Sequence, residues 1–203
     1  MQSHTEREFW EIIEQAGNPN TCSPRSQCQA MVDALKGSSR EELAWFSNTH
    51  FEMLDKLYTW TSLKACYVVL GYTSDDVFED FRNWIILHGK NRFYKTIDDP
   101  EVIADYAHVQ DPIEEINGEP LLYVCQDAWS GDIEELESTY RSPKDCPFPE
   151  QWPTQELLMA EFPKLAMRFR FGNSRDVCTE QWDQLILSEL SEKFDFKDAN
   201  STD

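Results

Sequence analysis

Lysine and arginine are absent from residues 96–140, a stretch of 45 residues that holds 13 Asp and Glu residues. This stretch, which we call the acidic window, carries −13 of the formal net charge of −20. A folded surface with that imbalance repels nucleic-acid backbones and anionic membranes, and it attracts basic proteins or cations. The sequence therefore predicts no direct binding to a nucleic-acid backbone or to a membrane, and it favours a basic protein as the partner.

Signals for export, for a membrane span and for a metal centre are also missing. Met1 is not followed by a basic and then apolar leader, and no apolar run approaches the roughly 18 residues of a spanning helix. The six cysteines include no CxxC pair, and no two of the four histidines lie within four residues of each other. We expect a cytoplasmic protein with reduced thiols, no metal site and no cofactor.

Catalytic motifs are equally scarce. The chain has only seven glycines, none of them in a glycine-rich phosphate loop, and it has no GxSxG nucleophile motif. Cys66 lies in an apolar helical segment, where packing is the simplest role for a thiol. No catalytic residue is predicted, and whether the protein is an enzyme stays open.

Residues that form a core, in contrast, are plentiful. Hydrophobic residues make up 40% and aromatic residues 13% of the 203 residues, whereas a disordered acidic chain would be poor in aromatics. A chain of this length can form one domain with a substantial core. We expect a single helical domain over residues 1–196 and a frayed tail over residues 197–203.

The dominant hydrophobic period is that of a helix, and evidence for strands is thin. Thr5 with Glu8, and Ser39 with Glu42, have the spacing of capping boxes, which predicts a helix start at each pair. The predicted fold class is mainly α, a compact single-domain multi-helix bundle with an irregular, proline-rich loop near residues 142–153. Its helices are expected over residues 5–17, 25–36, 39–57, 60–70, 74–88, 91–97, 99–106, 120–130, 156–169 (interrupted at Pro163) and 181–190.

The clearest of these helices covers residues 74–88. At 100° per residue Phe81, Trp84 and His88 fall on one apolar face, so Trp84 is expected in the core. A histidine on such a face is more often a hydrogen-bonded core residue than a metal ligand, and His50 lies in the same kind of setting.

Charged side chains beside that face form the sharpest candidate site. Asp75, Asp76 and Glu79 precede Arg82 along about two helical turns, next to Trp84. Such a set could bind a hard cation through the carboxylates or a polar ligand through the guanidinium. In the structural alternative, the acids complement the helix dipole and a partly buried Arg82 pairs with Glu79, Asp75 or an acid of another helix.

The acidic window is the second candidate. We expect it to be folded, with a helix over residues 120–130 and its carboxylates pointing outward. It could be a solvated surface that keeps the protein soluble, a docking face for a basic protein or a mimic of duplex DNA. The residues predicted to meet a partner are Glu114, Glu115, Asp132, Glu134, Glu135 and Glu137.

One stretch of the sequence resembles a known family. The run S-D-D-x-F-x-x-F-R-x-W at residues 74–84 is its most specific part, and EFW at 8–10, LLY at 121–123 and FPKL at 162–165 are weaker matches. On these residues the chain resembles the bacterial domain-of-unknown-function 4240 family over about residues 5–172. The resemblance implies a compact helical fold and transfers no activity.

Three functional hypotheses follow from these features. The first is a non-catalytic intracellular interaction protein, such as an immunity protein or an adaptor, that presents an acidic face to a basic partner. The second is an enzyme or a binder of a small ligand or cation that uses Asp75, Asp76, Glu79 and Arg82. The third is a DNA mimic. Binding measured at low and high salt separates the first from the second, because docking to an acidic face is salt-sensitive.

Overall fold

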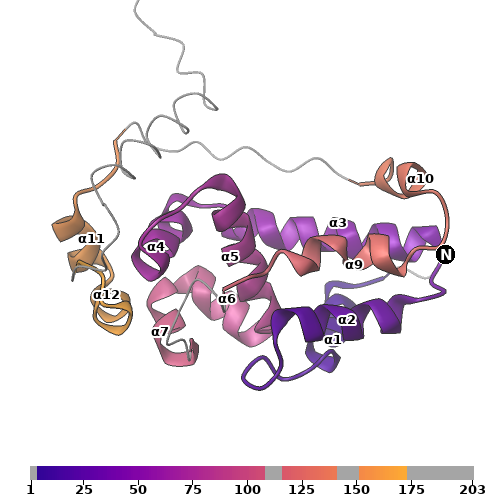
Figure 1. The fold of residues 1–203 in the computed structure, drawn as a ribbon, viewed down its shortest axis with the longest axis horizontal. Coiled ribbons are helices and arrows are strands. Elements are labelled where there is room, and N and C mark those ends of the chain that lie inside the picture. Colours follow the sequence, from indigo (N-terminus) through magenta and orange to yellow (C-terminus); the bar gives the residue numbers. More distant parts are fainter. Residues whose placement is uncertain (1–3, 108–115, 141–150, 173–203) are drawn as a thin grey trace, which may run out of the picture.

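The computed structural model describes residues 4–107, 116–140 and 151–172, and these residues form helices and no strand (Figure 1). The predicted mainly α fold is therefore confirmed. The expected helix over 181–190, the tail over 197–203 and most of the loop over 142–153 lie outside the described residues. The described elements are α1 (Glu6–Gln15), α2 (Pro24–Leu35), α3 (Arg40–Leu57), α4 (Trp60–Leu70), α5 (Asp75–Leu87), α6 (Lys90–Asp98), the 3-10 helix η1 (Pro100–Val102), α7 (Ile103–Tyr106), α9 (Pro120–Ala128), α10 (Ile133–Glu137), α11 (Gln155–Glu161) and α12 (Pro163–Phe169).

Both predicted capping boxes are present. The Glu8 carboxylate accepts from the Thr5 main-chain nitrogen at 2.6 Å, and the Thr5 hydroxyl accepts from the Glu8 nitrogen. Ser39 and Glu42 make the same reciprocal pair at the start of α3, at 2.7 Å and 3.2 Å. Each box satisfies main-chain donors that a helix start leaves without an internal partner. These two helix starts are therefore determined locally.

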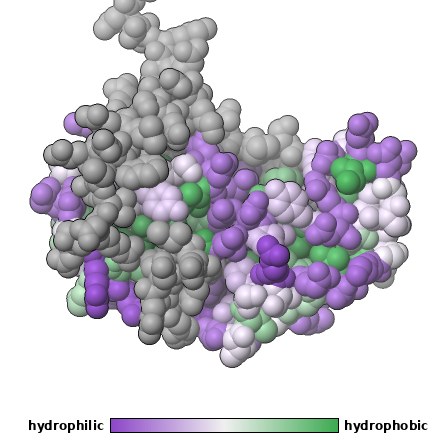
Figure 2. All heavy atoms as spheres, viewed as in Figure 1, coloured by the Kyte–Doolittle hydropathy of each residue, from purple (hydrophilic) through white to green (hydrophobic). Residues whose placement is uncertain are grey.

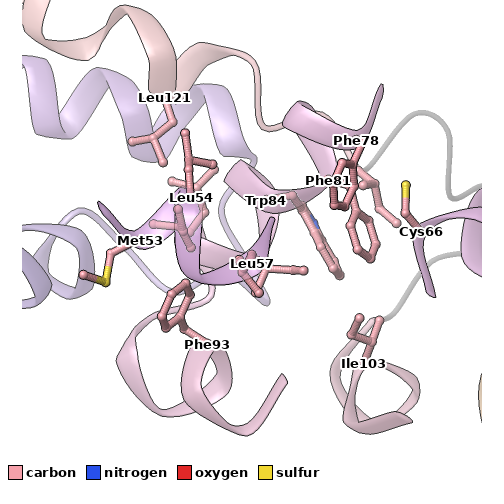
Figure 3. Close-up of a cluster of buried hydrophobic side chains, with 14 of the residues drawn as sticks. Met53, Leu54, Leu57, Cys66, Phe78, Phe81, Trp84, Phe93, Ile103 and Leu121 are labelled. Atoms are coloured by element: carbon pink, nitrogen blue, oxygen red, sulfur yellow. The ribbon is translucent and has the colours of Figure 1, made fainter. Parts of the chain in front are cut away.

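The core is built around α3 and α5, which contact each other and most of the neighbouring helices. Trp84 of α5 is only 4% exposed, which confirms its predicted place in the core. Full burial of large apolar groups is the main favourable term for a chain of this size. Figure 3 shows side chains of six helices meeting there: Met53, Leu54, Leu57, Cys66, Phe78, Phe81, Trp84, Phe93, Ile103 and Leu121.

The acidic window contributes a core helix, as predicted. The α9 helix lies between α2 and α3 (Figure 1) and buries Leu121, Val124, Cys125 and Ala128. Their spacing of three and four residues places them on one face. The apolar face of α9 thus holds the window on the domain while other positions of the window stay at the surface.

The observed elements differ from the predicted ones in two places. The stretch over 99–106 is a 3-10 turn followed by α7, with Asp99 capping the turn. The five-residue helix α10 was not predicted, because a single buried apolar residue among acidic residues gives no helical period that can be recognised in the sequence. It forms because Asp132 caps its first turn and Leu136 is fully buried.

The α4 helix is buried almost all round, as expected for a helix that is apolar on every side. The α11 and α12 helices cover it at the end of the molecule opposite α10 (Figure 1). Lys64 is the one charged residue on α4, and it pairs with Glu161 and lies over the Phe162 ring. None of the described helices is both long and apolar enough to cross a membrane.

Candidate functional site

The five residues of the predicted ligand site differ in how far they are buried. Asp75, Asp76 and Glu79 lie at the surface of α5, with Asp76 exposed and the other two partly buried. Arg82 and Trp84 instead face the core, where they are 9% and 4% exposed. Burial lowers the pKa of Arg82 and the charge of Glu79 acts in the opposite direction, so Glu79 lies near the guanidinium. The ligand site at these five residues stays a prediction.

Arg82 corrects the sequence-based interpretation in one respect. It is buried, as expected, but its hydrogen bonds go to the main-chain carbonyls of Phe78 at 3.3 Å and Leu54 at 3.2 Å. The guanidinium carbon also lies 4.6 Å and 4.7 Å from the ring centroids of Tyr58 and Phe78, two rings that stack on each other. No carboxylate of the described residues lies within ion-pair distance of Arg82. Carbonyls and ring faces take the place of the expected acid, because they lie within the core where the side chain is buried.

Asp80, which was not singled out from the sequence, faces a carboxylate of a distant segment. Burial raises the pKa of Asp80 to about 6, and the charges of Glu119, Glu79 and Asp76 act in the same direction. Glu119 is brought there by Gly118, which packs directly against the α5 main chain. A Cβ atom at Gly118 would lie 2.3 Å from the Asp80 carbonyl oxygen, so only glycine fits.

Acidic side chains around α5 do not form a metal centre. Within the described parts of the chain, no group of three or more His, Cys, Asp or Glu side chains is arranged to hold a metal ion. His50 is not available as a metal ligand for these acids either. Its ring nitrogen Nε2 lies 2.6 Å from Asn83 Oδ1, inside the core. His50 is thus a hydrogen-bonded core residue, as its position in the sequence predicted.

A different group of carboxylates is exposed to solvent. We call Asp127, Asp132, Glu134, Glu135 and Glu137 the α9–α10 acidic face, and all five residues are exposed. Glu114 and Glu115, the other predicted partner residues, lie outside the described residues.

Three contacts hold this face in place. Leu136 is fully buried beneath it. The Trp129 indole donates to the Asp132 carbonyl at 3.0 Å, and the Gln126 amide donates to the Glu137 carboxylate at 2.8 Å. The acids are therefore carried on an anchored turn and helix, in a defined arrangement.

The acids of the α9–α10 acidic face form no ion pair with a cation of the described residues. Ion pairs among the described residues use carboxylates of α1, α2, α3 and α11, and none uses an acid of this face. Ile133, in the middle of the face, is 48% exposed. Figure 2 shows an apolar patch set among hydrophilic residues at the end of the molecule where α10 lies.

A groove adjoins the acidic face. It has a volume of about 410 Å³ and runs between α2 and α9, which lie side by side in the same direction (Figure 1). Tyr123, 45% exposed, stands on its α9 side. Asp127 belongs to both the groove and the acidic face. The residues that line the groove are Arg25, Cys28, Gln29, Val32, Glu119, Pro120, Tyr123 and Asp127.

Comparison with known proteins identifies a family and no activity. A family model described as "Protein of unknown function (DUF4240)" matches residues 4–130, which is more than half of the chain. The match is shorter than the likeness over about 5–172 seen in the sequence: it covers α1 to α9 and ends before α10. Neither a curated protein nor a solved structure matches the chain.

Proposed function

We propose that this chain, which belongs to the DUF4240 family of proteins of unknown function, is a non-catalytic interaction protein that docks a basic partner on its α9–α10 acidic face. The observation that carries the proposal is the state of the five acids there. They are exposed, held on an anchored turn and helix, and unpaired with any cation among the described residues. An immunity protein and a regulatory adaptor both fit this description.

Such a face acts on a partner before contact. Uncompensated carboxylates produce a field that steers a basic protein toward them, and this raises the association rate more than the final affinity. Solubility alone does not require that acids gather on one turn and helix, since a mixture of both signs over the surface serves that purpose.

The cysteine chemistry supports a non-catalytic role. Burial raises the pKa of Cys28, Cys66 and Cys125 to about 12, so these thiols stay protonated at neutral pH. A thiol must be ionised to act as a nucleophile. These three residues therefore serve packing.

A matched pair of charge-reversal variants tests the proposal. Glu134→Lys with Glu135→Lys alters the acidic face, whereas Asp98→Lys with Asp105→Lys alters exposed acids of α6 and α7. Both double variants change the formal net charge from −20 to −16, so they differ only in where the charge lies.

The binding measurement uses a partner that wild-type protein captures at low salt and releases at high salt, purified afterwards. We expect the α10 double variant to slow its association about tenfold at low ionic strength, and the α6–α7 variant to change it much less. Equal rates for the two variants, or capture that salt does not weaken, would contradict the proposal. Competition by duplex DNA for the same partner would make the protein a DNA mimic in addition.

A further inference from the structure

The groove between α2 and α9 has the dimensions of a binding site for side chains. Its volume of about 410 Å³ lies within the roughly 300–1,000 Å³ of typical ligand pockets. The α9 side extends from Glu119 to Asp127, which is about 12 Å at 1.5 Å per residue, or two helical turns. A partner helix could place two successive anchors along it.

Half of the residues that line the groove are polar or charged, and the apolar half can receive an apolar anchor. Val32 and Cys28 are buried at its base, and Pro120 and the half-exposed Tyr123 ring add apolar surface on the α9 side. The Cys28 thiol stays uncharged because burial raises its pKa to about 12. Tyr123 is therefore an aromatic residue beside a buried groove floor, and such residues contribute much of the binding energy at protein interfaces.

The charges around the groove favour a cationic occupant. Glu119 and Asp127 line the α9 side, and Asp127 continues into the α9–α10 acidic face. Arg25 is the only cation in the lining, and it forms no ion pair within the part of the chain that the structure describes. The lining is thus net negative, with Arg25 as a local exception.

We infer that the groove receives the apolar side chains of a cationic amphipathic helix of the partner, whose basic residues face the α9–α10 acidic face. The inference rests on the proposed function and adds the chemistry of the docking segment. Helices that bind in grooves place anchors at intervals of three and four residues, which matches the two-turn length of this groove. The remaining positions of the same helix, outside its apolar face, then carry the lysines and arginines.

Two synthetic peptides of one composition serve as probes. In the first, leucine and lysine follow a helical period, so that the leucines share one face; in the second, the same residues alternate and no helical apolar face forms. Fluorescence anisotropy at low salt measures their dissociation constants. We expect the wild-type protein to bind the first peptide about tenfold more tightly than the second.

Variants in the groove determine whether the binding occurs there. Tyr123→Ala should weaken the first peptide about tenfold and leave the second nearly unchanged, whereas Met167→Ala, at an exposed apolar residue of α12, should change neither. Arg25→Gln should strengthen binding of the first peptide about threefold at low salt, because it removes a like charge. Lys95→Gln, on the surface of α6, is the charge-matched control.

The outcomes separate this inference from the proposed function. Weaker binding by the Arg25 variant would show that the groove takes an anionic group, and it would overturn the inference. Wild-type affinity in the Tyr123 variant would do the same. If groove variants have no effect while Glu134→Lys with Glu135→Lys weakens both peptides, the docking face stands and the groove assignment is wrong. If Glu134→Lys with Glu135→Lys changes the affinity for neither peptide, the result would contradict the proposed function itself.

Discussion

A buried histidine should make this protein sensitive to mild acid. His50 is 3% exposed, and its Nε2 atom lies 2.6 Å from Asn83 Oδ1. Burial lowers the pKa of His50 to about 4, the hydrogen bond to Asn83 acts in the opposite direction, and the charge of Arg82 lowers it further. The folded protein therefore holds a neutral imidazole that the unfolded chain would protonate near pH 6.5.

The sign and size of the effect follow from proton linkage. Between pH 6.5 and 4 the unfolded chain binds a proton at this residue that the folded protein excludes, so the free energy of unfolding falls as the pH falls. The stability that the protein gains by keeping His50 neutral is fully present above about pH 6.5 and is lost by about pH 4. A shift from 6.5 to about 4 corresponds to about 3 kcal/mol in total, of which about 2 kcal/mol is lost by pH 5.

Urea unfolding of wild-type protein and His50→Gln, followed by tryptophan fluorescence, measures this loss. Glutamine keeps an amide donor for Asn83 and does not titrate. At about pH 7.5 the variant should be less stable than wild type, and by about pH 5 the gap should narrow by roughly 2 kcal/mol. Comparing the two proteins at each pH cancels the titration of all other groups.

The control is Met167→Ala, at an exposed residue of α12 whose side chain does not titrate. Its stability difference from wild type should stay nearly constant over the same pH range. A stability gap between wild type and His50→Gln that is equal at both pH values would refute the reasoning, because His50 would then titrate alike in the folded and unfolded states.

Three further predictions concern Asp80, Gly118 (with Gly37 as its control) and Trp84. Asp80→Asn should stabilise the protein at pH 7 by about 0.5–1 kcal/mol, a value discounted for partial exposure; the folded pKa of Asp80 is raised to about 6, so the gain should fade as the pH drops through 6. Gly118→Ala should cost about 2–4 kcal/mol, because its Cβ would meet α5 main chain, whereas Gly37→Ala, with no atom within 4 Å, should cost about 1 kcal/mol for its positive φ alone. Trp84→Ala should cost about 3–5 kcal/mol by leaving a cavity. Denaturant unfolding measures all three, and a near-neutral Trp84→Ala would mean that α5 presents a different face to the core.

Local patterns in the sequence were enough to predict most helices. The capping box at Thr5 and Glu8 involves residues three positions apart, so its geometry is set wherever those residues occur. The apolar face of α5 was equally readable, because a helix repeats its face every three to four residues. The burial of Trp84 was predicted from the helical period and is confirmed. The exposure of Glu134 and Glu135 was predicted from their charge.

The arrangement of the candidate sites was decided by tertiary structure. The burial of Arg82 was expected from its position on α5, but its partners were not. The Leu54 carbonyl and the Tyr58 ring lie on and just beyond another helix, and no spacing within α5 identifies them. Gly118 similarly brings Glu119 against Asp80 through a contact between segments far apart in the chain.

The groove has the same origin. Arg25 and Tyr123 are nearly a hundred positions apart, and each is an ordinary surface residue of its own helix. They line one groove only because the buried face of α9 packs beside α2. The sequence by itself determined which residues are apolar, acidic or capping, since those properties act over a few residues; the packing of distant helices decided which of them meet.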